Sequence, residues 1–320
     1  MPRFFRGQPL TANRTRAFVA LGCAVHFCFW LGAALAQPPG TPLPEGIRGG
    51  SELVPEPRVE IRTYRFEETG EQLPYSLFVS SKITPGDKAP LIIALRGYTG
   101  TTLTFVRGTT IDLAEQGGYI LVGPIGYNNR AGFGVLAGPR PGPAPAGPPG
   151  ATPSAGPGDA QTPAARRAPP IVGGTAETDP ARVTEYSEKD VMNVLARVRK
   201  EFVIDDRRIY LMGHSQGGAG ARHLAEKYPE IWAGVALLAP APFGAELNAD
   251  SKILKLPVLI AVGDQDSLMA SARTLSELMK TLHAQVEYRE FAGLDHGTII
   301  LGSQPTVFAF FASHVNDRNQ

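Results

Sequence analysis

The stretch Ile209–Ala219 constrains the fold of this chain more than any other part of the sequence. Its first four residues are apolar and predict a buried strand, and the residues from Gly220 onward follow a helical pattern. Gly213-x-Ser215-x-Gly217 lies between the two, so the chain turns sharply from strand to helix at the serine. Such a turn holds the serine backbone in a strained conformation that projects the hydroxyl above the sheet.

The residues beside Ser215 have predicted roles of their own. Side chains at Gly213 and Gly217 would collide with the neighbouring strand and helix, which accounts for the two glycines. The amide of Gln216 begins the helix and would point at an oxyanion formed next to Ser215. The alternative interpretation is a glycine-rich strand-to-helix loop that occurs by chance or that binds phosphate.

Apolar runs and helical stripes alternate along the chain. Strands of the buried type are predicted at residues 90–95, 119–122, 209–212, 234–238 and 257–262, and a last strand at 286–291. Helices are predicted along the apolar stripe from Val191 to Phe202, at 268–282 and at 306–315. Two alternating segments, Val59–Phe66 and Leu73–Ser80, predict an antiparallel hairpin with one solvated face. We therefore expect an α/β fold with a mostly parallel, doubly wound sheet and an N-terminal antiparallel hairpin.

The first 36 residues have the composition of a secretory signal peptide. A region with four arginines and no acidic residue leads into the apolar stretch 17–35, and Ala34-Leu35-Ala36 fits a small-x-small cleavage site. An uncleaved membrane anchor is the alternative, because the apolar stretch is close to spanning length. Cleavage would remove the four arginines, taking the formal net charge from +1 to −3, and both cysteines, Cys23 and Cys28. We expect an extracytoplasmic protein, periplasmic or secreted, without disulfide or thiol chemistry.

Two segments rich in proline and glycine flank and interrupt the predicted domain, residues 58–316. Residues 37–57 are predicted to be a flexible leader. Residues 138–170 contain 11 proline, 6 glycine and 8 alanine among 33 residues and cannot bury enough apolar surface to offset the entropy of ordering. We expect a disordered insertion that leaves the carboxyl edge of the sheet and either covers the site there or extends into solvent.

His296 is the predicted base for the serine. A serine hydroxyl is a poor nucleophile near neutral pH and needs such a base next to it. His296 follows the last predicted strand, in a loop at the carboxyl edge of the sheet that can reach Ser215. The other histidines outside the signal segment lie beside the serine, behind it on its helix, or far from that edge: His214, His223, His283 and His314.

Asp266 is the predicted partner of His296. A carboxylate must orient the imidazole and stabilise its charged form. Asp264 and Asp266 both follow the strand at 257–262. Asp266 lies farther out and can turn toward the histidine, whereas Asp264 is expected to cap the loop or the next helix. Asp295 adjoins His296 and suits a turn. The order serine, aspartate, histidine is that of α/β-hydrolases and differs from both common serine-protease orders.

A second oxyanion donor is predicted in the loop after the strand at 90–95. This loop reads Arg96-Gly97-Tyr98-Thr99-Gly100. Gly97 allows the backbone to approach closely, and the amide of Tyr98 is the candidate donor. A plain turn is the alternative interpretation.

These motifs together resemble the α/β-hydrolase superfamily over about residues 58–316. The most specific parts are residues 205–219, 227–234 and 263–267. Within the superfamily the chain is similar to secreted esterases related to polyhydroxybutyrate depolymerases and feruloyl esterases, and to catalytic domains of prolyl-oligopeptidase type. In such families the loop after the third strand usually begins His-Gly, and here it begins Arg96-Gly97. The resemblance implies ester or amide hydrolysis without a metal or organic cofactor.

The leading functional hypothesis is a secreted serine carboxylesterase that acts on a small or polymer-derived ester. A serine peptidase of prolyl-oligopeptidase type is the second, although only a short hairpin precedes the hydrolase strands and leaves no room for a propeller domain. A catalytically silent binding module is the third, and a missing Ser215, Asp266 or His296 would have favoured it. The charge balance gives no case for nucleic acid or, after signal cleavage, a membrane surface. The sequence does not indicate an oligomeric state.

Overall fold

The computed structural model describes residues 56–136 and 170–317. All of them belong to one of the two compact units into which the chain divides, residues 47–320. The predicted signal segment lies outside the described residues. So do the predicted leader and insertion, except for residues 56, 57 and 170 at their margins.

The described strands form one eight-stranded sheet in the order β1-β2-β4-β3-β5-β6-β7-β8. Only the pairs β1–β2 and β2–β4 are antiparallel, and the remaining pairs are parallel. The strands are β1 (Val59–Arg65), β2 (Gln72–Val79), β3 (Ala89–Leu95), β4 (Ile120–Pro124), β5 (Ile204–His214), β6 (Gly234–Leu238), β7 (Val258–Gly263) and β8 (Val286–Phe291). This arrangement confirms the predicted parallel sheet with an N-terminal antiparallel hairpin.

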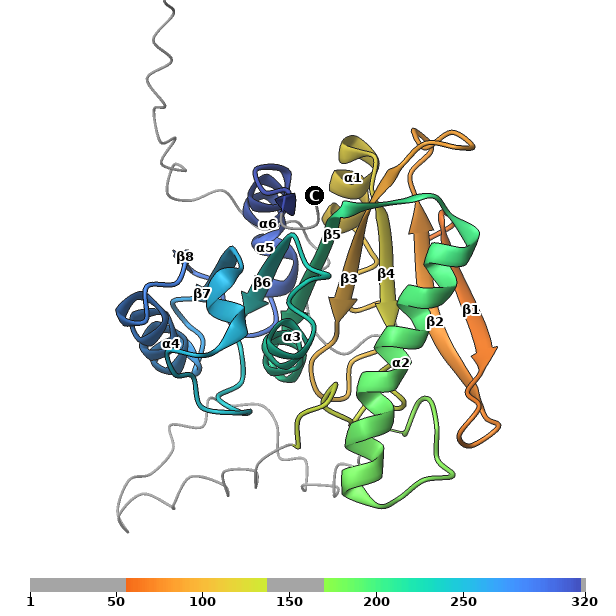
Figure 1. The fold of residues 1–320 in the computed structure, drawn as a ribbon, viewed down its shortest axis with the longest axis horizontal. Helices are drawn as coiled ribbons and strands as arrows, with labels where there is room; N and C mark the ends of the chain where they lie inside the picture. Colours follow the sequence, from red (N-terminus) through yellow and green to blue (C-terminus); the bar gives the residue numbers. More distant parts are fainter. Residues whose placement is uncertain (1–55, 137–169, 318–320) are drawn as a thin grey trace, which may run out of the picture. The chain divides into compact units, whose positions relative to one another are not determined.

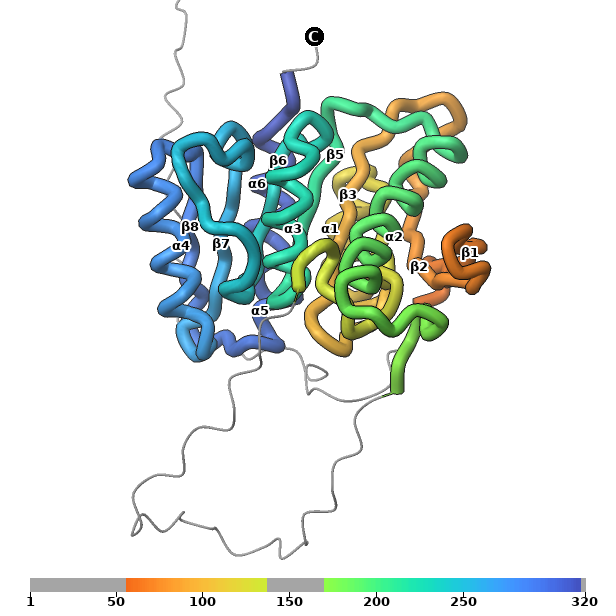
Figure 2. The backbone as a smooth tube through the Cα atoms, turned by 60° about the horizontal axis from the view of Figure 1, so that its bottom comes forward, coloured from red at the N-terminus to blue at the C-terminus, as the bar shows by residue number. Residues whose placement is uncertain are grey.

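Helices cover both faces of the sheet, as Figures 1 and 2 show. One face packs against α2, α3 and α4, and the other against α1 and α6. The helical segments are α1 (Thr109–Gly117), α2 (Pro180–Glu201), α3 (Gln216–Lys227), the short 3-10 helix η1 (Lys252–Lys255), α4 (Met269–Thr281), α5 (Ile299–Gly302) and α6 (Gln304–Ala312). None of the helices in these residues combines the length and apolar character that a membrane span requires.

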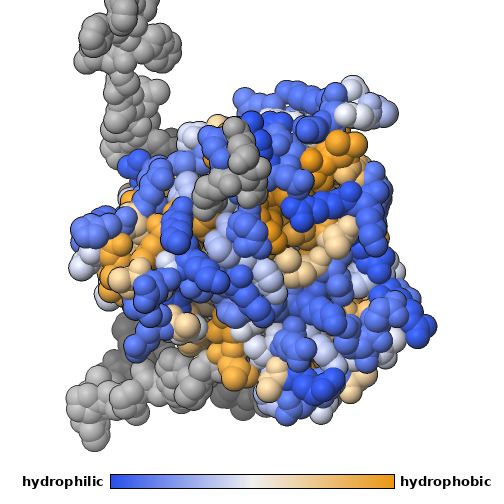
Figure 3. All heavy atoms as spheres, in the orientation of Figure 1, coloured by the Kyte–Doolittle hydropathy of each residue, from blue (hydrophilic) through white to orange (hydrophobic). Residues whose placement is uncertain are grey.

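The two-sided core accounts for the continuous apolar runs in the sequence. In β3, Leu91 and Ile93 face the layer of α2 and α3, whereas Ile92 and Ala94 face the layer of α1 and α6. Both faces of this strand are therefore buried, and alternation of polar and apolar residues is absent. On the outer surface of α2, α3 and α4, hydrophilic residues separate smaller hydrophobic patches (Figure 3).

The structure corrects three details of the predicted elements. Helix α1 was not predicted. The hairpin does not keep one solvated face, because β2 lies between β1 and β4 and buries Leu77 against one layer and Phe78 against the other. Strand β5 begins at Ile204, five residues before its apolar run, and pairs there with Ala89 of β3.

A charged cluster joins α2 to α3 behind the serine turn. Glu188 of α2 accepts hydrogen bonds from His223 Nε2 at 2.7 Å, Lys227 Nζ at 2.6 Å and the Tyr228 hydroxyl at 2.6 Å. Burial alone would raise the pKa of Glu188, but these three donors outweigh it and lower the pKa to about 2. The cluster therefore stabilises the packing of the two helices while the carboxylate is ionised.

We expect Glu188→Gln to lower the free energy of unfolding by about 1 kcal/mol at pH 7, a modest value because His223 and Lys227 are partly exposed and screened. The folded-state pKa lies below the unfolded value, so the contribution is complete above about pH 4.5 and disappears as the pH falls toward 2. Urea unfolding of both proteins across this range measures it. Glu185→Gln, an exposed site on the same helix, is the control. An equal deficit at pH 2 and pH 7 would contradict the assignment.

Candidate active site

Ser215 lies in the sharp turn between β5 and α3. Its backbone has φ 55° and ψ −117°, a region that residues with a side chain rarely adopt. A Cβ atom on Gly213 would strike the Gly217 carbonyl oxygen, and one on Gly217 would strike the carbonyl oxygens of Leu95 and Arg96. The glycines thus allow α3 to begin directly against the ends of β3 and β5, and the turn presents the serine hydroxyl at the carboxyl edge of the sheet.

Two hydrogen bonds connect Ser215, His296 and Asp266. His296 Nε2 lies 2.9 Å from Ser215 Oγ, and His296 Nδ1 lies 2.8 Å from Asp266 Oδ2. The Asp266 side chain is completely buried, whereas 42% of the His296 side chain is exposed. The carboxylate is therefore shielded from water, whereas the imidazole is partly accessible. The structure thus brings together the three residues that the sequence predicted for this role.

The alternative aspartates lie in turns. Asp264 accepts a hydrogen bond from the Gly293 amide at 2.8 Å. Asp295 accepts hydrogen bonds from the amides of Gly297, at 3.0 Å, and Thr298, at 2.8 Å. Neither carboxylate forms a hydrogen bond with His296 among the described contacts, so each has the loop or turn role that was expected of it.

The buried His214 contacts both the backbone and the ring of His296. Its Nε2 atom lies 2.7 Å from the carbonyl oxygen of His296, and the two rings are tilted with their centroids 4.5 Å apart. Burial, with a smaller contribution from the neighbouring His296, lowers the pKa of His214 to about 3, so the ring stays neutral and donates from Nε2 to that carbonyl. The sequence placed His214 beside the serine but gave no sign of a contact with the His296 loop.

The two predicted oxyanion donors belong to backbone segments that lie next to Ser215. Gln216 is the first residue of α3, where a backbone N–H has no partner within the helix. Gly97 packs against the serine from the other side, because a Cβ on Gly97 would lie 3.4 Å from Ser215 Cβ. The peptide that joins Gly97 to Tyr98 therefore passes beside the nucleophile.

Arg96 is a residue at this site whose contacts the sequence did not reveal. It is 1% exposed, and its guanidinium donates to the carbonyl oxygens of Ile125 at 3.0 Å, Gly97 at 3.0 Å and Ala131 at 2.9 Å, and to that of Asn128. A fifth, long contact of 3.5 Å reaches the side-chain oxygen of Gln216. All five N–H groups of the guanidinium thus have an acceptor.

Asp190 is the carboxylate whose negative charge stabilises the charged form of Arg96. It is fully buried on α2 and accepts hydrogen bonds from the Tyr64 hydroxyl at 2.7 Å and the Gly126 amide at 2.6 Å. Burial raises the pKa of Asp190 to about 6, although these donors and the charge of Arg96 oppose the rise. A sequence signal existed, because Asp190 lies four residues from both Tyr186 and Val194 on the buried stripe of α2.

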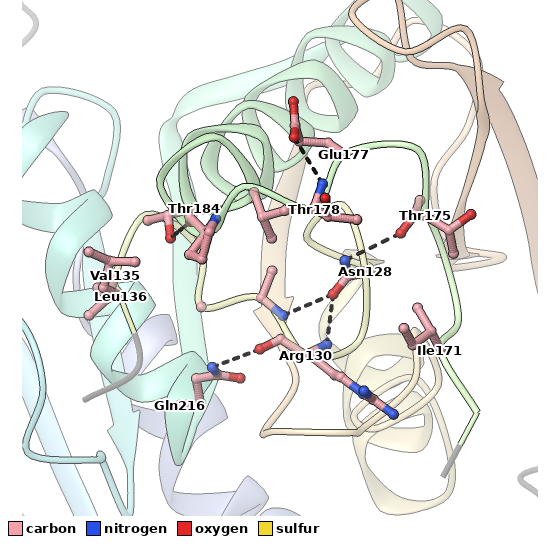
Figure 4. A pocket seen from close by; sticks show the side chains of 15 residues that line it. Asn128, Arg130, Val135, Leu136, Ile171, Thr175, Glu177, Thr178, Thr184 and Gln216 are labelled. Atoms are coloured by element: carbon pink, nitrogen blue, oxygen red, sulfur yellow. Dashed lines mark hydrogen bonds between the residues drawn. The ribbon is translucent and has the colours of Figure 1, made fainter. Parts of the chain in front are cut away.

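A cavity of about 400 Å³ borders the site at Gln216 (Figure 4). The Gln216 side chain donates to the carbonyl oxygen of Arg130 at 3.1 Å and forms part of the cavity wall. Polar and apolar side chains line the rest in equal number, but most of the exposed lining surface is apolar, and the apolar residues are Ala131, Val135, Leu136, Ile171, Pro180 and Val183. Its size is that of an ordinary small-molecule pocket. No group of three metal-ligating side chains occurs within residues 56–136 and 170–317.

Comparisons with known proteins agree on the fold. A family model described as the alpha/beta hydrolase fold matches residues 127–257, a range that contains Ser215 and ends before Asp266. No curated protein sequence matches the chain. The solved structures described next have low sequence identity to it.

Two of these structures are esterases by name, and a third is named as an S-formylglutathione hydrolase. A thermostable esterase is 18% identical with a TM-score of 0.52; the match covers 81% of this chain and only 63% of that longer chain. A ferulic acid esterase from Anaeromyces mucronatus, bound to ferulic acid, is 16% identical with a TM-score of 0.55, and the match covers 86% and 96%. An S-formylglutathione hydrolase from Agrobacterium tumefaciens is 18% identical with a TM-score of 0.55, and the match covers 80% and 95%.

The chain has the α/β-hydrolase fold. The strand order, the serine turn after β5 and the positions of Asp266 and His296 after β7 and β8 all agree with this placement. The structures that it resembles include esterases, as the sequence resemblance implied.

Proposed function

We propose that the protein is a serine carboxylesterase that works through an acyl-enzyme intermediate. The observation that carries this proposal is the continuous relay from Ser215 through His296 to the buried Asp266, with both hydrogen bonds below 3 Å. A serine held in this way has a base within reach of its proton, and the base has a carboxylate that fixes its tautomer.

In the proposed acylation step, Ser215 Oγ attacks the ester carbonyl carbon while His296 Nε2 takes the hydroxyl proton. The amides of Gln216 and Tyr98 donate to the oxyanion of the tetrahedral intermediate. The intermediate collapses with loss of the alkoxide, which receives its proton from His296. Water then attacks the acyl-enzyme with His296 again as the base, which releases the carboxylic acid and restores Ser215.

The cavity beside Gln216 supports an ester with one bulky, largely apolar group. Its apolar lining favours burial of such a group, and its wall includes the side chain of a residue that supplies an oxyanion donor. We propose that the larger group of the ester lies there. An ester whose acyl and alcohol groups are both small would leave the cavity empty and lose that contribution to binding.

The first test is hydrolysis of p-nitrophenyl acetate and butyrate by the full chain, followed by labelling with a fluorophosphonate and peptide mass spectrometry. We expect turnover of both esters and a single phosphonylated residue, Ser215. Aminoacyl amides assayed in parallel distinguish the peptidase hypothesis. Turnover of the amides without turnover of the esters would replace the esterase by a peptidase, and no labelling at Ser215 would favour the silent module.

A further inference from the structure

We infer that Arg96 is a positioning residue that orients both oxyanion donors of the proposed esterase. The inference rests on the proposed function and extends it to a residue in contact with neither the nucleophile nor its base among the described contacts. Its basis is the position of one buried guanidinium between the loop after β3, the loop after β4 and the start of α3.

The first donor is oriented through a peptide plane. The carbonyl of Gly97 and the amide of Tyr98 belong to the same peptide group, and in a trans peptide they point in opposite directions. Arg96 Nη1 donates to the Gly97 carbonyl oxygen at 3.0 Å, and the Gly100 amide donates to the same oxygen at 3.0 Å. Two donors on one carbonyl fix the plane of the peptide and hence the direction of the Tyr98 N–H.

The second donor is oriented through a side chain. Arg96 Nη1 also contacts Gln216 Oε1 at 3.5 Å, and Gln216 Nε2 donates to the Arg130 carbonyl oxygen at 3.1 Å. Both ends of the Gln216 side-chain amide are therefore held, which anchors the residue whose backbone N–H is the second donor. The contact from Arg96 is long and weak, so the plane of the Gly97–Tyr98 peptide carries the larger share of the effect.

The remaining bonds of Arg96 explain why an arginine is required. Ile125, Asn128 and Ala131 present carbonyl oxygens from the loop after β4, and a planar guanidinium can donate to these and to the Gly97 carbonyl together. The Phe133 ring lies 4.8 Å from the guanidinium carbon and covers one face of it. A lysine has three donors from a single nitrogen and would leave at least one of these four carbonyls without its donor.

The test compares wild type, Arg96→Lys and Arg222→Lys with p-nitrophenyl butyrate. Arg222 is the matched control, because it is a partly buried arginine on α3 that donates to the Phe243 carbonyl oxygen, away from both oxyanion donors. Active sites are counted by end-point fluorophosphonate labelling, so that kcat refers to folded enzyme. Inhibition by butylboronic acid is measured as well, because its tetrahedral adduct on Ser215 Oγ places an oxygen where the oxyanion would lie.

For Arg96→Lys we expect kcat per labelled site to fall about 100-fold, KM to change less than about threefold, and the inhibition constant of the boronic acid to rise about as much as kcat falls. Arg222→Lys should leave all three within about threefold of wild type. A purely structural role would lower the labelled fraction and the melting temperature but not kcat per site.

An Arg96→Lys enzyme with wild-type kcat per site and boronic acid affinity would overturn the inference. If the lysine variant does not fold, Arg96→Gln takes its place, because glutamine brings no charge into the core. The same outcomes decide that experiment. Wild-type protein without Ser215-dependent ester turnover is a different result, which rejects the proposed function and this inference with it.

Discussion

Replacement of Ser215 by alanine is expected to reduce kcat toward aryl esters by at least about 10⁴-fold, with little change in KM. The hydroxyl oxygen is the atom that forms the acyl-enzyme bond, so its loss removes the covalent pathway altogether. The remaining oxyanion donors and binding contacts can only accelerate direct attack by water. Steady-state assays of the variant beside wild type, together with loss of the pre-steady-state burst, measure the effect.

The fold of the Ser215→Ala variant should be unchanged. Alanine has the same Cβ as serine and therefore meets the same backbone constraint at φ 55°. The hydrogen bond from the amide of residue 215 to the Leu238 carbonyl also remains. We therefore expect a melting temperature within about 2 °C of wild type. Ser187→Ala controls for loss of a serine hydroxyl: Ser187 is buried, donates to the Thr184 carbonyl and accepts from the Gly134 amide. Undiminished turnover by Ser215→Ala would show that another residue is the nucleophile.

The sheet was predictable because its strands are buried on both faces. A run such as residues 258–263 can be apolar throughout only where helices cover each side, and such runs indicate parallel strands. Helix α1 was missed because it has only nine residues and three buried positions, too few for a recognisable helical period. The start of β5 was missed for a related reason: residues 204–208 are mostly polar and are recruited by pairing with β3, which is a tertiary effect.

The site was predictable where side chains follow strand ends. Ser215, Asp266 and His296 each come after a parallel strand, and the carboxyl ends of such strands meet at one edge of the sheet. The contacts of Arg96 follow a different logic. Its acceptors are mainly backbone carbonyls of residues 97, 125, 128 and 131, which converge only when the loops after β3 and β4 close. Backbone acceptors leave no trace in side-chain identity, so this part of the site required the structure.

Asp266→Asn is expected to lower kcat by about 10⁴-fold while leaving the fold and KM nearly unchanged. Asp266 Oδ1 accepts a hydrogen bond from the Leu268 amide at 2.8 Å, and Oδ2 lies 2.8 Å from His296 Nδ1. In the asparagine variant the Leu268 N–H still needs an acceptor, so the amide oxygen takes the first position and the NH₂ group faces His296. His296 Nδ1 must then accept a hydrogen bond from this NH₂ group, so the ring proton moves to Nε2.

That tautomer cannot act as a base toward Ser215, because Nε2 would present a hydrogen to Ser215 Oγ instead of a lone pair. Asp264→Asn is the matched control: it lies two residues away, and its amide oxygen can keep the bond from the Gly293 amide, so kcat should stay within about threefold of wild type. Steady-state kinetics of wild type and the two variants test this, with the active sites of each protein counted by end-point fluorophosphonate labelling. Equal losses of kcat in both variants would contradict a specific role for Asp266. A loss confined to Asp264→Asn would show that Asp264, and not Asp266, orients His296.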